Sequence, residues 1–307
     1  MNNQQNSFTI LVEKAMQQQG RAHMRPVIEK ELLHYDILFA LDQEGLLDKL
    51  TFQGGTALRL CYGAPRFSED LDFVGGYDFK KEDLESLKAC IEAYLKKRYD
   101  LAVSVKEPKV LEETLDERGI KINKWQIRIV THPERPDFHK QMIKIEIANI
   151  PAYTREPRPL QANYDFLLDG YSDTLVMVET LDEIFADKLI SLVNCQVYVR
   201  HRDIWDLHWL KKHGASLRLA LIQKKILDYK ITDYLHKVEN FRQRSKAIIH
   251  GEAFKLQMSR FLPEDVQVRT LLKEKFYDFL YNEIDTIFSH VQLSFNEAFS
   301  QNLKIEK

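Results

Sequence analysis

Residues 54–73 read Gly-Gly-Thr-Ala-Leu-Arg-Leu-Cys-Tyr-Gly-Ala-Pro-Arg-Phe-Ser-Glu-Asp-Leu-Asp-Phe. The end of this stretch predicts a short apolar strand in which Leu71 and Phe73 point to one face. Asp70 and Asp72 then share the other face, roughly 6.6 Å apart. Two such carboxylates repel each other unless a cation lies between them. Their hard oxygen atoms suit Mg²⁺, and a pair of ions can stabilise the attacking and leaving oxygens of an in-line displacement.

The start of the same stretch predicts a phosphate site. Gly54 and Gly55 follow an apolar segment and precede a helix that begins near Thr56. Glycine lets the backbone approach a ligand closely, and a helix N-terminus offers free N–H groups to a phosphate. Thr56 can cap the helix or donate its hydroxyl to a nucleotide. A glycine pair alone is a common turn, and Asp-x-Asp alone is common on surface loops. The order strand, Gly-Gly, helix, loop and acidic strand favours a nucleotide and metal site.

This segment resembles the AbiEii/AbiGii toxin family, which includes MenT-like toxins and lies within the polymerase-beta-like nucleotidyltransferase superfamily. The superfamily signature is Gly-Gly or Gly-Ser followed by Asp-x-Asp. The lead-in Arg66-x-Ser68 is more specific to the family. The resemblance implies that Arg66 and Ser68 position the nucleotide phosphates or order the loop before the metal strand. An exposed turn is the alternative for each.

A third carboxylate is expected on a later strand. Residues 143–148 alternate so that three isoleucines share one face, whereas Lys144 and Glu146 share the other. Superfamily members commonly carry a third carboxylate on a neighbouring strand, and the resemblance places Glu146 there. Glu146 would then be a general base toward the acceptor hydroxyl or a ligand of the second metal. The alternative is a solvent-facing glutamate beside Lys144.

A helix that follows residue 180 carries a lysine on its apolar face. Thr180 and Glu183 have the spacing of a capping box, which accounts for Glu183. Lys188 lies on the apolar stripe, where a lysine is costly unless an anion meets it. The resemblance implies that Lys188 contacts the triphosphate as a point charge. A lysine that extends its charged end to solvent at a domain edge is the alternative.

The next helix begins with Arg-Asp-Ile-Trp-Asp-Leu at residues 202–207, which matches a further motif of the family. Asp203 and Asp206 are three residues apart and therefore neighbours on the helix surface. Acidic residues in a first turn are favoured by the helix dipole whatever their function. The resemblance makes Asp203 a partner for Lys188 or for the acceptor, whereas Asp206 is expected to be structural.

The composition limits the class of protein. The 307 residues are 44% hydrophobic with a net charge of −2, which is ordinary for a globular chain and gives no global signal for nucleic acid. The basic and aromatic run at residues 241–246 could hold an RNA backbone, although a solvated helix face is the favoured alternative. No apolar run is long enough to span a bilayer, and the N-terminus lacks signal-peptide features. The three cysteines form no Cys-x-x-Cys motif, so we expect a cytoplasmic protein without zinc.

The periodicity predicts a mixed α/β region followed by a helical tail. With the resemblance, this implies an α/β (α+β) nucleotidyltransferase fold, with a mixed sheet flanked by helices, and a C-terminal helical bundle. We place the nucleotidyltransferase domain at residues 1–213, with its motif core at 50–207, and the helical domain at 214–307. The expected helices span 8–20, 26–43 and 82–99, and the expected strands span 101–105, 122–130 and 142–149.

The predicted reaction transfers a nucleoside monophosphate from an NTP to an acceptor hydroxyl and releases pyrophosphate. Asp70, Asp72 and Glu146 would hold Mg²⁺ or Mn²⁺. The resemblance implies a toxin of a bacterial toxin–antitoxin or phage-defence system, with tRNA or another RNA as acceptor and a cognate antitoxin as a possible partner. Two alternatives stay open: the same chemistry on a protein side chain (AMPylation) or on a small molecule, and a non-catalytic module that binds nucleotide or a partner.

Overall fold

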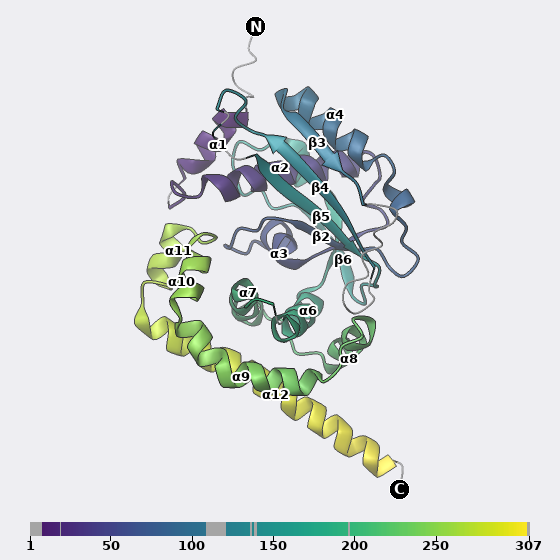
Figure 1. Ribbon diagram of the computed structural model, residues 1–307, viewed down its shortest axis with the longest axis vertical. Helices are drawn as coiled ribbons and strands as arrows, with labels where there is room; N and C mark the ends of the chain where they lie inside the picture. The colour runs from purple at the N-terminus through teal and green to yellow at the C-terminus, as the bar shows by residue number, and fades with distance from the viewer. Residues whose placement is uncertain are drawn as a thin grey trace. The chain divides into compact units, whose positions relative to one another are not determined.

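The computed structural model describes residues 8–18, 20–108, 121–135, 137, 140–195 and 197–305 (Figure 1). The chain forms two compact units. The first comprises Met1–Glu179 with Phe261–Asp265, and the second comprises Thr180–Arg260 with Val266–Lys307. The domain boundary at 213/214 that the sequence suggests stays a prediction, and it falls inside the second unit, just after α7 (His201–Lys212).

The first unit is built on a mixed sheet with the strand order β3-β4-β5-β2-β1-β7-β6. Its strands are β1 (Thr51–Gln53), β2 (Leu71–Val74), β3 (Ala102–Lys106), β4 (Ile122–Val130), β5 (Gln141–Ala148), β6 (Arg155–Pro159) and β7 (Leu175–Glu179). The pairs β2–β5 and β1–β7 are parallel, whereas the other neighbours are antiparallel. The predicted mixed sheet is therefore confirmed, and three of its strands lie where alternation placed them.

Helices flank this sheet. They are α1 (Phe8–Met16), α2 (Arg25–Gln43), α3 (Gly54–Tyr62), the 3-10 helix η1 (Lys81–Leu84), α4 (Leu87–Tyr99) and α5 (Asp169–Ser172). The helix predicted over 82–99 is thus broken, because a 3-10 turn precedes α4. In Figure 1, α4 lies alongside β3. The apolar faces of β4 and β5, including Ile127, Ile143 and Ile145, are fully buried in the core beneath α2 and α4.

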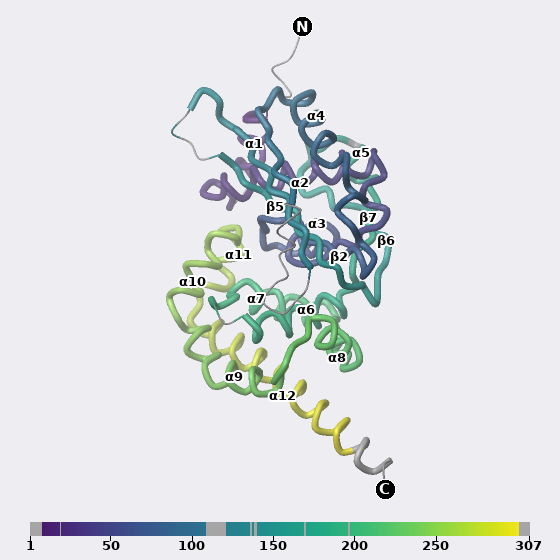
Figure 2. The backbone as a smooth tube through the Cα atoms, turned by 45° about the vertical axis from the view of Figure 1, so that its right-hand side comes forward, coloured from purple at the N-terminus to yellow at the C-terminus, as the bar shows by residue number. Residues whose placement is uncertain are grey.

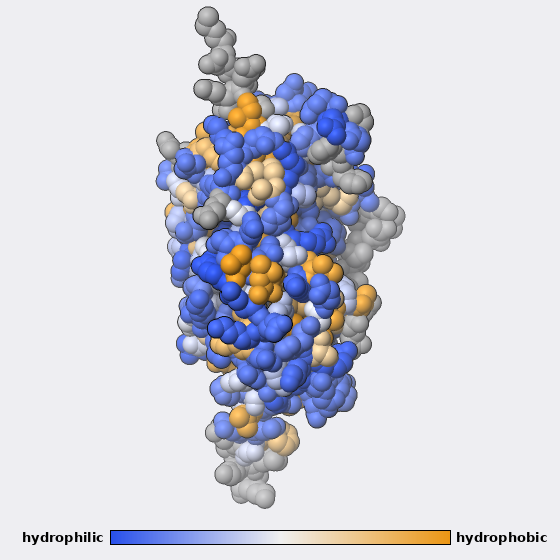
Figure 3. All heavy atoms as spheres, turned by 90° about the vertical axis from the view of Figure 1, so that its left-hand side faces the viewer, coloured by the Kyte–Doolittle hydropathy of each residue, from blue (hydrophilic) through white to orange (hydrophobic). Residues whose placement is uncertain are grey.

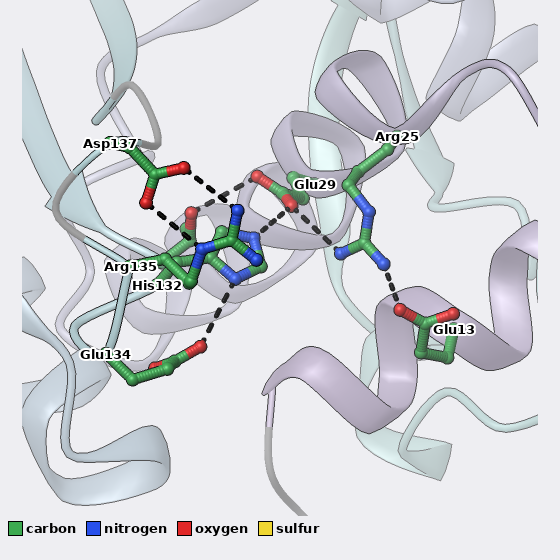
Figure 4. Close-up of polar contacts among 8 residues, drawn as sticks. Glu13, Arg25, Glu29, His132, Glu134, Arg135 and Asp137 are labelled. Atoms are coloured by element: carbon green, nitrogen blue, oxygen red, sulfur yellow. Dashed lines mark hydrogen bonds and ion pairs between the residues drawn. The ribbon is translucent and has the colours of Figure 1, made fainter.

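A polar cluster fastens α2 to the sheet (Figure 4). The buried carboxylate of Glu29 accepts a hydrogen bond of 2.7 Å from the Gln141 amide, and its other oxygen lies 2.9 Å from His132 Nε2. Arg25 bridges this carboxylate to Glu13 of α1. A buried carboxylate is tolerable only with such partners. The cluster therefore fixes α1 and α2 against the ends of β4 and β5.

The second unit is helical. It contains α6 (Leu181–Asn194), α7, α8 (Leu219–Asp228), α9 (Tyr234–His250), α10 (Glu252–Ser259) and α12 (Glu274–Ile305), whereas α11 (Glu264–Arg269) has residues in both units. The central helix α6 packs against α7, α8 and α9. Figure 2 shows α9 and α12 side by side. The predicted C-terminal helical region is confirmed.

A buried ion cluster holds α8 on α6. The Lys225 side chain is completely buried, and its Nζ lies 2.8 Å from Glu183 Oε1 and 3.0 Å from Asp187 Oδ2. Thr180 is the N-cap of α6 as predicted, but its side chain makes no cap hydrogen bond to the helix. Glu183 instead supplies the carboxylate that Lys225 needs, since an uncompensated buried ammonium group would be costly.

The surface is mixed. On the face drawn in Figure 3, hydrophobic residues form small separate patches within a mainly hydrophilic surface. Within the part of the chain that the structure describes, no helix is both long enough and apolar enough to pass through a membrane.

Candidate active site

The turn between β1 and α3 carries a glycine that the fold requires. Gly54 has φ +78°, a left-handed conformation that other residues rarely adopt. A Cβ at this position would lie only 3.0 Å from Asp72 Oδ2. Because β1 pairs with β2 so that Gln53 lies opposite Asp72, the carboxylate is directed over the first residue of α3. The turn therefore lets an acidic side chain lie directly on the backbone at the start of a helix.

The second glycine makes room for the Arg66-x-Ser68 lead-in. A Cβ on Gly55 would lie 2.3 Å from Arg66 Nη2 and 3.1 Å from Ser68 Oγ. Arg66 is buried, with an exposed fraction of 3%, and its Nη1 donates a 2.8 Å hydrogen bond to the carbonyl of Phe67. The structure thus brings Gly55, Arg66 and Ser68 together at the N-terminus of α3. A guanidinium group and a helix N-terminus at one place both favour an anion.

Two buried side chains fix the loop that leads into β2. The Thr56 hydroxyl donates to the carbonyl of Asp70, and His34 Nε2 lies 3.1 Å from the carbonyl of Glu69. The prediction that Thr56 caps α3 is wrong, because the N-cap is Gln53. Burial lowers the pKa of His34 to about 4, so this ring is neutral at physiological pH. Thr56 therefore positions the acidic strand through its backbone.

The first acidic residue is tied to the neighbouring strand. Asp70 Oδ1 accepts a 3.0 Å hydrogen bond from the backbone N–H of Lys144, and Lys144 Nζ lies 3.8 Å from Asp70 Oδ2. The Asp70 carboxylate is partly exposed, with 30% of its side-chain surface accessible. One oxygen is thus held by β5 while the group stays reachable from solvent.

The third carboxylate lies beside the second. The parallel register of β2 and β5 pairs Asp72 with Glu146, so the two side chains point to the same face of the sheet. Glu146 Oε1 lies 2.7 Å from Nζ of Lys124, its register partner on β4. Glu146 therefore pairs with Lys124, whereas its sequence neighbour Lys144 is directed to Asp70. No local pattern pointed to Lys124, because strand register decides this contact.

The carboxylates of Asp70, Asp72 and Glu146 fit a hard divalent cation whose remaining ligands come from a substrate. Asp72 and Glu146 offer carboxylate oxygens on one face of adjacent strands, Asp70 lies one residue before β2 and not within it as predicted, and Lys124 and Lys144 balance part of their charge. Among the described residues, no group of three or more His, Cys, Asp or Glu side chains is arranged to hold a metal ion by itself. Mg²⁺ usually binds through one or two carboxylates and completes its shell with phosphate and water. Glu146 as a metal ligand stays a prediction.

In the second unit, Lys188 is enclosed by carboxylates of α7. Its Nζ lies 2.7 Å from Asp203 Oδ1 and 3.0 Å from Asp206 Oδ2, and only 8% of the residue is exposed. Asp203 Oδ2 also accepts hydrogen bonds from the Ser191 hydroxyl, at 2.7 Å, and from Arg200 Nε. Burial would raise the pKa of Asp203, but the positive charges of Lys188 and Arg200 outweigh it and hold that pKa below its usual range.

The contacts of Lys188 show which anions meet this buried lysine. The sequence predicted that an anion meets Lys188, and two carboxylates of this chain do so. The predicted pairing with Asp203 is present, and Asp206 takes part equally. Contact between Lys188 and a nucleotide stays a prediction that rests on the family resemblance. Ser191 was missed because only the packing of α6 on α7 brings it to Asp203. Arg200 lies three residues before Asp203, a local spacing that could have indicated the contact.

A family profile covers both groups of residues. The profile described as nucleotidyl transferase AbiEii toxin, type IV toxin–antitoxin system, matches residues 36–286, which is most of the chain. The chain belongs to the AbiEii nucleotidyltransferase family. The matched range includes both the Gly54–Asp72 region and the Lys188 network. This AbiEii protein is therefore a nucleotidyltransferase, and an NTP is its expected substrate.

The chain also has a distant structural similarity to solved structures, with TM-scores below 0.5. JHP933 from Helicobacter pylori has 17% identity and a TM-score of 0.45, with 92% of this chain and 98% of that chain covered. An H. pylori protein described as a candidate nucleotidyltransferase has 17% identity and a TM-score of 0.46, with coverage of 89% and 97%. A STING-associated CdnE c-di-GMP synthase from Capnocytophaga granulosa has 14% identity and a TM-score of 0.24, with coverage of 95% and 89%. No curated protein matches the chain.

Proposed function

We propose that this AbiEii protein transfers a nucleoside monophosphate from an NTP to a hydroxyl group of an RNA acceptor such as tRNA. The acceptor oxygen forms a bond to the α-phosphorus while the bond to the β-phosphate oxygen breaks, and pyrophosphate leaves with that electron pair. The hydroxyl proton passes to a base of the protein. The observation that best supports this proposal is the register that sets Asp72 beside Glu146, with Gly54 directly beneath Asp72.

The residues around α3 would bind the triphosphate. The N–H groups at the N-terminus of α3 can bind a phosphate, and Arg66, which packs against Gly55, adds a positive charge there. The Ser68 hydroxyl lies in the same place and can donate to a phosphate oxygen. Thr56 contributes by holding the Asp70 backbone. A contact between Lys188 and the nucleotide is implied only by the family resemblance, and within the second unit this lysine pairs with Asp203.

Asp70 and Asp72 would hold the metal, with Glu146 beside them. A bound Mg²⁺ or Mn²⁺ ion would neutralise phosphate charge and stabilise the attacking and leaving oxygens. Glu146 lies on the same face and is the candidate acceptor of the hydroxyl proton. Lys144 holds Asp70 in position through its backbone N–H. The protein's contribution is thus positioning and charge balance, as is usual in phosphoryl-type transfer.

The biological role that we propose is that of a toxin in a toxin–antitoxin or phage-defence system, restrained by a cognate antitoxin. The family to which the chain belongs supports this role. The RNA acceptor is supported by the resemblance of the Arg66-x-Ser68 motif to that family. A protein side chain and a small molecule are the competing acceptors, and the experiment below separates them.

The test incubates the purified chain with each NTP, radiolabelled at the α-phosphate, together with total bacterial RNA, lysate protein and Mg²⁺ or Mn²⁺. Asp72→Asn removes a charge from the site, and Asp78→Asn removes one from an exposed position just downstream as a matched control. We expect ribonuclease-sensitive label with wild type and Asp78→Asn, none with Asp72→Asn, and none after chelation of the metal. Protease-sensitive label would replace the RNA acceptor with a protein. Full activity of Asp72→Asn would refute the site.

A further inference from the structure

The helical unit contains a cavity that the catalytic scheme does not use. Its volume is about 620 Å³, within the range of ligand sites. Its walls come from the end of α6, from α9 and from the segment that joins α6 to α7. The connecting segment supplies Tyr198, and α9 supplies two basic residues, Lys237 and Arg244.

The charge in this cavity favours an anion. Among the described residues that line it, none is an aspartate or a glutamate. Lys237 Nζ donates to the neutral amide oxygen of Asn194 at 2.8 Å, and Arg244 Nε donates to the carbonyl of Asn240 at 3.2 Å. Within the described residues, neither cation is paired with a carboxylate. Two positive charges therefore stay uncompensated at a concave surface, which attracts negatively charged ligands.

Other cavities of the same unit differ in charge. One of about 430 Å³ is lined by Glu252, Glu274 and Asp278 beside one lysine. Another, of about 520 Å³, contains Arg242, but that guanidinium donates two hydrogen bonds to Asp285. The cavity between α6 and α9 is thus distinguished by free positive charge, not by size alone.

The remaining lining suits a planar base. The Tyr198 side chain is exposed, with 61% of its surface accessible although it lies at a cavity. An exposed aromatic ring is the usual platform on which an unpaired nucleic-acid base stacks. Asn240 and Gln243 are exposed amides at the same wall, and an amide can donate to and accept from a base edge. Phosphate and base chemistry therefore meet in one place.

The spacing of the cations indicates a strand rather than a single phosphate. Lys237 and Arg244 are two helical turns apart on α9, which corresponds to about 10.5 Å along its axis. One phosphate group cannot bridge that distance, whereas successive phosphates of an extended strand can. The cavity also adjoins the Lys188 network, because Leu192 of its wall lies one turn beyond Lys188 on α6. The joining segment then leads directly to Arg200, which contacts Asp203.

We propose that this cavity binds a single-stranded segment of the acceptor RNA. Lys237 and Arg244 contact successive phosphates, Tyr198 stacks on a base, and Asn240 and Gln243 contact the edge of that base. The inference rests on the proposed function, because it takes RNA to be the acceptor. It adds a specific binding site on the helical unit to the transfer site of the first unit.

The experiment measures binding of a fluorescent single-stranded RNA oligonucleotide to the full chain by anisotropy, over a series of salt concentrations. The double variant Lys237→Gln/Arg244→Gln is compared with Lys224→Gln/Lys246→Gln, which removes the same charge from exposed positions outside the cavity. Loss of two phosphate contacts should reduce the slope of log K against log salt concentration by about 1.4 and weaken binding at least about tenfold. Tyr198→Ala should weaken binding by about five- to a hundredfold without changing that slope.

Either of two results in the binding experiment would overturn the inference. One is equal RNA affinity and equal salt slope for the cavity variant and its control. The other is displacement of the RNA by a free NTP at its own binding concentration, which would make the cavity a mononucleotide site. Radiolabel transfer separates this inference from the proposed function. If wild type labels no RNA, the proposed acceptor fails; if wild type and the cavity variant label RNA at equal rates, only the cavity assignment fails.

Discussion

A single methyl group can probe the contact between Gly54 and the Asp72 carboxylate in the proposed site. Alanine at position 54 would place its Cβ 3.0 Å from Asp72 Oδ2, closer than ordinary van der Waals contact. The carboxylate must then shift by a few tenths of an ångström. The backbone must also hold φ near +78°, which costs an L-residue about 1–2 kcal/mol. Gly54→Ala therefore combines a stability cost with displacement of one catalytic oxygen.

The same helix supplies a control for the stability cost. Gly63, the C-cap of α3, has φ +74°, and a Cβ there would meet nothing within 4 Å. Gly63→Ala should thus lose the same 1–2 kcal/mol, roughly 2–8 °C in Tm, and leave Asp72 in place. Because a misplacement of about 1 Å can cost about a hundredfold in rate, we expect Gly54→Ala to lower kcat/KM by about tenfold relative to Gly63→Ala.

The assay pairs urea unfolding of each variant with steady-state transfer of radiolabelled nucleotide at a temperature where both are folded. Equal stability with a selective loss of kcat/KM in Gly54→Ala supports a catalytic position for Asp72. Equal kcat/KM in the two variants would refute it, because Gly54→Ala, unlike Gly63→Ala, must displace that carboxylate.

Three further predictions concern buried charge. Asp203→Ala removes a carboxylate from Lys188 and should lower the free energy of unfolding by about 3–5 kcal/mol in urea titration; a change under about 1 kcal/mol would show that the Lys188 network is not stabilising. His34 has its pKa lowered from 6.5 to about 4, so the stability that it contributes is present above pH 6.5 and is lost as the pH falls toward 4. Unfolding of His34→Leu should lack this dependence, worth up to about 3 kcal/mol, and an unchanged pH profile would contradict the assignment. Lys225→Met leaves the buried Glu183 uncompensated and should cost about 3–5 kcal/mol in thermal unfolding, whereas an unchanged Tm would mean that the ion cluster contributes nothing.

The parts of the site that lie in one stretch of chain were predictable. The glycine pair marked the turn before α3, and alternation placed Asp72 in a strand, although β2 begins at Leu71 and leaves Asp70 just outside it. These signals are readable because strand periodicity and left-handed turns depend on neighbouring residues only. The mixed sheet and the helical C-terminal region followed from the same short-range patterns.

The capping box at Thr180 lacks its predicted side-chain hydrogen bond, because packing between helices engages Glu183. A Thr followed three residues later by Glu has the spacing of a capping box, yet the Glu183 carboxylate forms an ion pair with Lys225 of a different helix. A completely buried lysine requires a carboxylate more strongly than a helix end requires a cap, because an exposed helix end can use water instead. The packing of α8 on α6 therefore outweighed the local capping preference of this segment.

The sequence by itself thus determined the turn glycines and the approximate spans of β3, β4 and β5, whereas β6 and β7 were not predicted. Only the tertiary structure decided which charges meet. The register of β4, β5 and β2 selected Lys124 for Glu146 and set Glu146 beside Asp72. The packing of α7 on α6 enclosed Lys188 between carboxylates. These contacts join residues far apart in the chain, and their geometry depends on strand register and helix packing, which no local periodicity encodes.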